Sequence, residues 1–144
     1  MLIRRLTSSD ANFAASLMAE LGYPTTADAF AERFAALCTN PHNAVLVAEA
    51  QGSILGLVSV HSFEMLHRPG RLGRITALVV ASSARGHGVG TRLLRDAEDH
   101  LQKSGCTVLE VTSNDQRADA HAFYAARGYQ EKRVRFVKSS ARTA

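Results

Sequence analysis

The sequence predicts an α/β fold in which a mixed β-sheet carries helices on both faces. Short strand-like segments alternate with amphipathic helical segments along the 144 residues. Ile75–Ala81 is an almost continuous apolar run, which is typical of a central strand buried on both faces. After it, apolar residues recur at helical spacing over Val89–Lys103. The length suits one domain, so we expect a single domain over residues 1–144 with a loose tail from 138 to 144.

The N-terminal part is predicted to form one strand followed by two helices. Leu2–Leu6 read as the strand. Ser9 is expected to cap the first helix and Gly22 to end it, while Thr26 is expected to cap the second. Each helix presents an apolar stripe, formed in the first by Phe13, Leu17, Met18 and Leu21 and in the second by Phe30, Phe34 and Leu37.

The middle of the chain predicts a hairpin that leads into the central strand. Val45–Glu49 and Ile54–His61 are strand-like, and Gln51-Gly52 between them is a turn signal. His67–Gly73 is expected to be a basic, glycine-containing connection.

The C-terminal part predicts a strand, a helix and further strand-like residues. Cys106–Val111 is an apolar strand. Asn114 or Asp115 is expected to cap a helix that ends at Gly128, and Tyr129–Lys138 then supply strand-like ends. The predicted order is therefore β-α-α-β-β-β-α-β-α-β.

Composition narrows the classes of function. Hydrophobic residues make up 46% and charged residues 21%, which is a globular balance. We expect a cytoplasmic protein without a membrane partner, because no apolar run is long enough to cross a bilayer and no signal peptide is visible. The net charge of +4 comes from scattered residues without a basic run, so no nucleic-acid partner is expected; the charge fits either a solvated basic surface or attraction for an anionic ligand. Cys38 and Cys106 lack the neighbours of a zinc site, and no metal is expected.

The glycine-rich segment Arg85–Gly90 is the strongest functional signal. It lies between a buried strand and a helix N-terminus, where backbone N–H groups lack intrahelical partners. Glycines let these amides close on an anion such as a phosphate or pyrophosphate. Thr91-Arg92 after Gly90 fit neither a Walker loop nor a dinucleotide fingerprint. The alternative is a turn that only joins strand to helix.

Two motifs resemble the GCN5-related N-acetyltransferase (GNAT) family. Arg85, Gly88 and Gly90 match its Arg/Gln-x-x-Gly-x-Gly/Ala loop, and Asn114 followed by Ala120–Tyr124 and Gly128-Tyr129 matches its later motif. The resemblance implies a mixed, mostly antiparallel twisted sheet. It also implies transfer of an acetyl group from acetyl-CoA, the co-substrate, to the amine of a small molecule by direct attack. Family members often dimerise, so a homodimer is a further expectation.

The resemblance also implies site residues. Tyr124 is the expected catalytic acid, because a phenol beside the sulfur can protonate the leaving thiolate; the alternative is an aromatic residue that only packs. The residues expected to bind the cofactor are Leu78, Val79, Val80, Arg85, Gly86, His87, Gly88, Val89, Gly90, Thr91, Asn114, Ala120, Phe123 and Tyr124.

The general base has no obvious residue. Many family members carry a glutamate on the fourth strand, and Ala77 stands in the aligned stretch here. His61 and His67 are candidates, since imidazole titrates near neutral pH, and Glu64 lies between them; the alternative for each is a surface or hairpin residue that is not a base. The missing carboxylate also leaves open a catalytically weak acyl-CoA-binding regulator or sensor.

The acceptor amine is the least determined feature. The C-terminal motif and the histidine on the third strand resemble those of aminoalkylphosphonate N-acetyltransferases, which act on small amines that carry a phosphonate. An anionic substrate of this kind would favour arginines near the site, and the candidates are Arg68, Arg71, Arg74 and Arg135; the alternative for each is a solvated basic surface.

Overall fold

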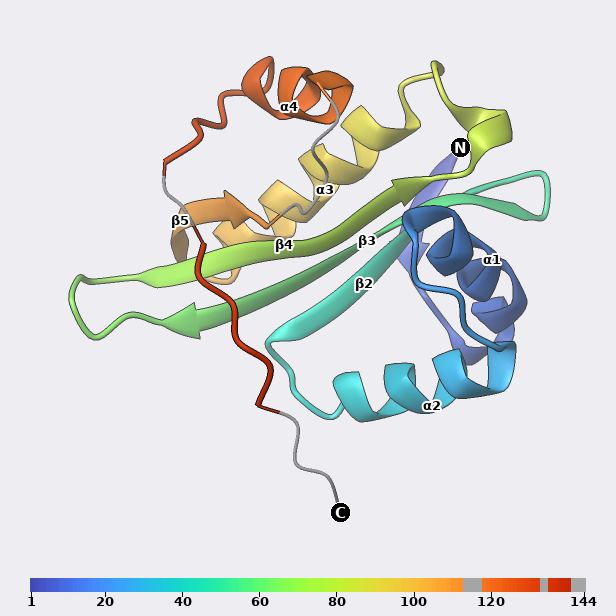
Figure 1. The fold of residues 1–144 in the computed structure, drawn as a ribbon, viewed down its shortest axis with the longest axis horizontal. Coiled ribbons are helices and arrows are strands. Elements are labelled where there is room, and N and C mark those ends of the chain that lie inside the picture. Colours follow the sequence, from blue (N-terminus) through green and yellow to red (C-terminus); the bar gives the residue numbers. More distant parts are fainter. Residues whose placement is uncertain (113–117, 133–134, 141–144) are drawn as a thin grey trace. The chain divides into compact units, whose positions relative to one another are not determined.

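The computed structural model describes residues 1–112, 118–132 and 135–140, in two units that divide after residue 113. The first unit contains a five-stranded sheet with the order β1-β2-β3-β4-β5 (Figure 1). Its strands are β1 (Leu2–Arg5), β2 (Asn43–Ala50), β3 (Ser53–Glu64), β4 (Arg71–Val80) and β5 (Cys106–Val111). β1 to β4 pair antiparallel, and β5 pairs parallel to β4.

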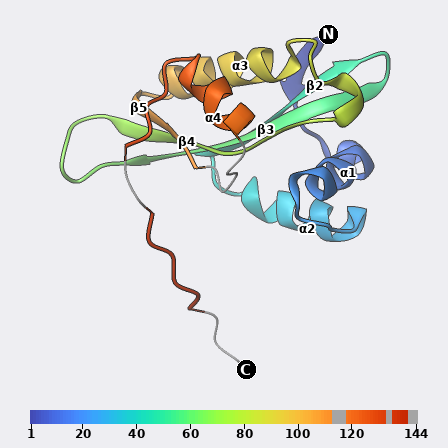
Figure 2. The same cartoon turned by 45° about the horizontal axis from the view of Figure 1, so that its top comes forward.

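Helices cover both faces of this sheet. α1 (Ala11–Leu21) and α2 (Ala27–Leu37) lie on one face and α3 (Val89–Lys103) on the other (Figure 2). Short 3-10 turns, η1 (Ser8–Asp10) and η2 (Ser82–Ala84), precede α1 and α3. The predicted fold class is therefore confirmed. In the described part of the chain, none of the helices combines the length and apolar character needed to cross a bilayer.

Side chains of the central strands alternate between the two faces of the sheet, so the sheet contributes to a buried layer on each face. Leu57 and Val79 belong to a buried cluster with Leu17 of α1. On the opposite face, the absence of a side chain at Gly56 lets α3 pack closely against β3. A Cβ built on Gly56 would lie only 3.0 Å from a methyl carbon of Leu93. Since neighbouring side chains on a strand point to opposite faces, each strand supplies both layers.

Two β-bulges interrupt the ladders of β3. Between β2 and β3 the register shifts at Ala48/Glu49, so Leu55 is an extra residue of β3. Between β3 and β4, Ser59 pairs with Ala77 and Val60 with Ile75, so Thr76 is an extra residue of β4. A bulge re-aims the side chains on one side of it relative to the partner strand.

Some predicted boundaries were wrong in the first unit. Ser9 does not cap α1; it lies within η1, and its hydroxyl is 2.8 Å from that of Thr7. The connection after β3 is shorter than predicted, because β4 begins at Arg71 instead of near Ile75. The reason is pairing of polar residues: Glu64 and Arg71 are cross-strand partners, and their charged groups lie 3.6 Å apart.

The second unit contains α4 (Ala118–Ala125) and the residues that follow it. The predicted strand over Tyr129–Lys138 was wrong, because no described residue there belongs to a strand. A strand requires a hydrogen-bonded neighbour, and an alternating pattern does not supply one. Phe136 and Val137, which made this segment strand-like, are 93% and 75% exposed. The predicted helix cap at Asn114 or Asp115 lies outside the described residues.

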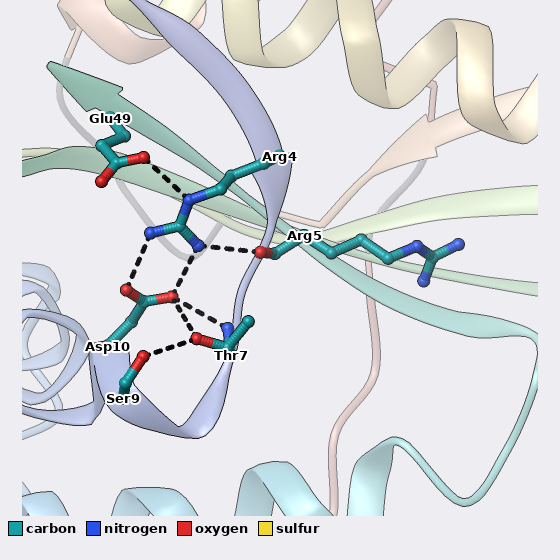
Figure 3. Close-up of polar contacts among 6 residues, drawn as sticks. All are labelled: Arg4, Arg5, Thr7, Ser9, Asp10 and Glu49. Carbon is teal, nitrogen blue, oxygen red and sulfur yellow. Dashed lines mark hydrogen bonds and ion pairs between the residues drawn. The ribbon is translucent and has the colours of Figure 1, made fainter.

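An ion-pair cluster joins β1, β2 and η1 (Figure 3). The Arg4 guanidinium donates two hydrogen bonds to the Asp10 carboxylate, at 2.8 and 2.9 Å, and one to Glu49, at 2.9 Å. The backbone N–H of Thr7 donates to the same Asp10 carboxylate at 2.8 Å. The hydrogen bond from Arg4 is the largest cause that lowers the pKa of Asp10 from its usual 3.8 to about 2, against burial, which raises it.

This cluster makes stability depend on acid. Because the folded pKa of Asp10 lies below the unfolded pKa, the stabilisation is complete above about pH 4 and is lost as the pH falls towards about 2. We expect Asp10→Asn to lower the free energy of unfolding at pH 7 by about 2 kcal/mol. We also expect the free energy of unfolding, measured by urea denaturation, to fall less in Asp10→Asn than in the wild type as the pH is lowered (the acid limb). Asp99→Asn is the control, since the Asp99–Lys103 pair is exposed. Equal acid limbs in wild type and Asp10→Asn would contradict the prediction.

Candidate functional site

Among the described residues, no strand pairs with one edge of β4 along half of its length. β5 pairs with β4 only from Arg71 to Ile75, and the last contact is the N–H of Thr112, which donates to the Ile75 carbonyl at 3.4 Å. β4 continues from Thr76 to Val80, and no strand of the described residues pairs with that side of it. In Figure 1, β5 lies beside only the first part of β4. An unpaired strand edge offers backbone N–H and C=O groups to an extended ligand that carries amides.

The glycine-rich loop follows directly from this edge. Gly86 and Gly88 have φ angles of +81° and +80°, a left-handed conformation that disfavours side chains with a Cβ. Apart from the two chain neighbours of each glycine, no atom of the described residues lies within 4 Å of a Cβ built on Gly86 or Gly88, so the surface there is open to a ligand. Gly88 is the N-cap of α3, and the first helical hydrogen bond runs from the Arg92 N–H to the Gly88 carbonyl at 3.1 Å.

The amides at the start of α3 therefore point out of the helix. Val89 and Gly90 precede the first residue that donates within the helix, so their N–H groups have no acceptor inside it. α3 spans 15 residues and adds the positive end of its dipole. Thr91 continues this first turn and is half-buried. The arrangement suits a phosphate or pyrophosphate group.

The side chains of the loop are placed at the surface. Arg85 is exposed, and its Nε donates to the Val80 carbonyl at 3.3 Å, which ties the loop to the end of β4. His87 is exposed, with Nδ1 3.4 Å from the Ala84 carbonyl. Val89 is buried and anchors the first turn of α3. The loop thus exposes polar groups while one apolar residue fixes its position.

The predicted residues of the central strand lie beside the free edge. Leu78, Val79 and Val80 pair with β3 on the opposite side. Val79 is buried in the α1 cluster, whereas its two neighbours are half-buried. Ala77, in place of a carboxylate, directly follows the bulge at Thr76.

The predicted residues of the second unit lie on α4, except one. Ala120, Phe123 and Tyr124 are half-buried. The Tyr124 ring packs edge-to-face against Phe123, with ring centroids 5.2 Å apart, and against Tyr129 at 5.8 Å. These contacts fix the ring within its own unit. The predicted cofactor residue Asn114 lies outside the described residues.

A polar row crosses the sheet beside the bulge, and the sequence did not indicate it. Register places Asn43, His61, Arg74 and Glu110 side by side on four neighbouring strands. His61 Nδ1 is 2.6 Å from the Asn43 side-chain oxygen, and Arg74 Nε donates to Glu110 at 2.5 Å. Of the other predicted base candidates, Glu64 and His67 are exposed. The structure therefore distinguishes His61 from them.

The four arginines that are candidates for binding an anionic substrate have different surroundings. Arg74 is paired with Glu110, and Arg71 donates to the Ser62 carbonyl at 2.9 Å. Arg68 lines a hollow of about 310 Å³ at the β3–β4 turn, together with Arg71. Arg135 is exposed in the second unit.

A larger hollow, of about 430 Å³, borders the glycine-rich loop. Gln51 and Ser53 of the β2–β3 turn line it, as do Ala84, His87 and Val89 of the loop and the first turn of α3. It adjoins β3, on the side of β4 away from the unpaired edge. The candidate site consists of the unpaired edge and the amides of α3, and this hollow borders it at His87 and Val89.

These features fit the parts of a CoA thioester. The open glycine surface and the outward amides suit its diphosphate, and the unpaired edge from Thr76 to Val80 suits its amide-containing arm. Both features belong to the first unit.

The fold and the site define an acetyltransferase class. The chain belongs to the Acetyltransferase (GNAT) family, whose profile matches residues 11–129. It is 33% identical over 138 residues to the aminoalkylphosphonate N-acetyltransferase of Salmonella typhimurium, covering 95% of this chain and 90% of the relative. It is 34% identical to glucosamine 6-phosphate N-acetyltransferase 1 of Oryza sativa, covering 77% and 68%. The structure of glucosamine-6-phosphate N-acetyltransferase from Arabidopsis thaliana superposes with a TM-score of 0.83 at 26% identity, covering 97% and 98%.

Proposed function

We propose that this protein transfers the acetyl group of acetyl-CoA to the primary amine of a small molecule that also carries a phosphonate or phosphate. The observation that carries the proposal is that the unpaired β4 edge leads directly into the open glycine loop at the start of α3. Two of the relatives act, by their names, on an aminoalkylphosphonate and on an amino sugar phosphate. Both substrates join an amine to a phosphorus oxyanion, which supports the substrate class.

The residues of this chain have distinct roles in the proposal. Val89, Gly90 and the open surface of Gly86 and Gly88 would hold the diphosphate, and Leu78–Val80 would line the arm of the thioester. Acetyl-CoA supplies an acyl carbon bonded to a good leaving group. Tyr124 would donate a proton to the departing sulfur, whose unperturbed thiol pKa is about 8.5.

The reaction forms one bond and breaks another. The ammonium group of the acceptor first gives up a proton, and the resulting amine bonds to the acyl carbon. The carbon–sulfur bond then breaks, and the sulfur receives a proton from Tyr124, which regains one from solvent. The nitrogen gives up its second proton to solvent, which leaves the neutral amide and the free thiol. A base is needed because a protonated amine has no lone pair for attack.

An acyl-CoA sensor is the second candidate, favoured by Ala77 at the place where many relatives carry a carboxylate. It would bind acetyl-CoA through the same loop without turnover.

The test follows thiol release from acetyl-CoA with matched pairs of amines. Aminomethylphosphonate is compared with methylamine, and glucosamine 6-phosphate with glucosamine; a polyamine, an aminoglycoside and a peptide complete the panel. We expect release with at least one phosphorus-bearing amine and a kcat/KM at least tenfold above its matched partner. Equal rates within each pair would refute the substrate class. Calorimetric binding of acetyl-CoA without any release would favour the sensor.

A further inference from the structure

The orientation of the Asn43 amide is fixed by two hydrogen bonds. Its Nδ2 donates to the Leu37 carbonyl at the end of α2, at 3.0 Å. A carbonyl only accepts, so the group that faces Leu37 is the NH₂ group. The Asn43 oxygen Oδ1 therefore faces His61 and lies 2.6 Å from Nδ1 of its imidazole.

This contact determines the tautomer of His61. An amide oxygen only accepts, so Nδ1 of the imidazole carries the hydrogen and donates it. In the neutral ring the lone pair is then on Nε2. The tautomer is assigned here from the hydrogen-bonding partners of Asn43.

The imidazole ring is also held in place by stacking. The His61 and Phe63 rings lie 5.8 Å apart between centroids, at 28°. The Arg74 guanidinium lies over the same Phe63 ring, 5.3 Å from its centroid. His61 is half-buried, so its Nε2 is held in one environment instead of moving freely in solvent.

The register places His61 beside the point where the β4 edge becomes free. His61 pairs with Arg74, and Ser59, two residues before it on the same face, pairs with Ala77. Thr76, the bulged residue between these pairs, begins the unpaired edge. The charged groups in this row are Arg74 and Glu110, and they are bound to each other.

We propose that His61 Nε2 is the proton acceptor for the attacking amine and that Asn43 is the positioning residue that presents it. The inference rests on the proposed function. The N–H bond of the substrate ammonium breaks, its proton moves to Nε2, and the lone pair left on nitrogen forms the bond to the acyl carbon. The Glu110 carboxylate does not compete for this role because the Arg74 guanidinium occupies it.

The kinetic test uses His61→Gln, which removes the basic nitrogen. We expect kcat to fall about 100-fold at neutral pH, within the range for loss of a general base, while the Kd of acetyl-CoA stays unchanged. The loss should shrink as the pH rises towards the titration of the amine, since a neutral amine already has the lone pair that attacks the acyl carbon. His61→Asn, which keeps a donor for Asn43 but lacks Nε2, should behave alike. His42→Gln, at an exposed neighbouring histidine, is the control.

The outcomes separate this inference from the proposed function. A His61→Gln loss that is equal at every pH and with every amine would indicate a structural role and overturn the inference. Full activity of the variant would overturn it too. A wild-type protein that releases no thiol with any amine overturns the proposed function itself.

A second measurement does not depend on activity. Imidazole nitrogen chemical shifts from ¹⁵N NMR distinguish the two neutral tautomers. We expect the Nδ1–H form for His61 in the wild type and a mixture in Asn43→Leu. An Nε2–H form in the wild type would overturn the inference.

Discussion

Replacing Tyr124 with phenylalanine is expected to lower kcat about 100-fold and to leave the Kd of acetyl-CoA unchanged. The loss corresponds to removal of a general acid, because the sulfur must then leave as an unprotonated thiolate. Phenylalanine keeps the ring contacts to Phe123 and Tyr129, so α4 should stay folded. Stopped-flow or steady-state thiol release measures kcat, and calorimetry measures the Kd.

Tyr129→Phe is the matched control for this change. It removes a hydroxyl from the ring that packs against Tyr124, 5.8 Å away, and should leave kcat near that of the wild type. If Tyr124→Phe retained full activity, Tyr124 would be a packing residue, and the acid would have to be another group or solvent.

Replacing Gly88 with alanine is expected to raise the Kd of acetyl-CoA at least tenfold. Gly88 has a φ of +80°, and a left-handed conformation costs an L-residue about 1–2 kcal/mol. The added Cβ also enters the open space next to the amides of Val89 and Gly90. Isothermal titration calorimetry measures the change directly.

Gly22→Ala is the control for backbone strain. Gly22 is the C-cap of α1, with a φ of +106° and open space around its Cβ position. Both variants should lose similar stability in thermal unfolding, but only Gly88→Ala should lose binding. If both kept the wild-type affinity, the α3 N-terminus would not be the diphosphate site.

Local signals predicted the first unit well. Gln51 and Gly52 both have positive φ, 51° and 77°, as expected for a two-residue hairpin turn. Thr26 caps α2 by accepting from the Ala29 N–H at 3.0 Å, and β5 spans Cys106–Val111 as predicted. These features depend on neighbouring residues, so the sequence alone carries them.

The polar row could not be predicted because it depends on bulges. Counting back from the Gln51-Gly52 turn pairs Asn43 with Val60, which points to the other face. The bulge at Leu55 shifts the register by one residue and brings Asn43 opposite His61. No residue type marks that bulge, so His61 could be noticed as a candidate while its partner could not.

In the proposed site, the length of the unpaired β4 edge would set the distance between the anionic anchor at α3 and the bulge at Thr76. From Val80, where the loop begins, to Thr76 the strand spans four residue steps, which is about 13 Å. A ligand anchored by its anionic end at α3 therefore brings only the atoms at that distance to the bulge. The Arg74–Glu110 ion pair lies at the end of the unpaired edge that is distant from α3. It is one residue pair before Ile75, the last residue of β4 that pairs with β5. Adding or removing a rung of β4–β5 pairing would change which atom of an extended ligand reaches His61.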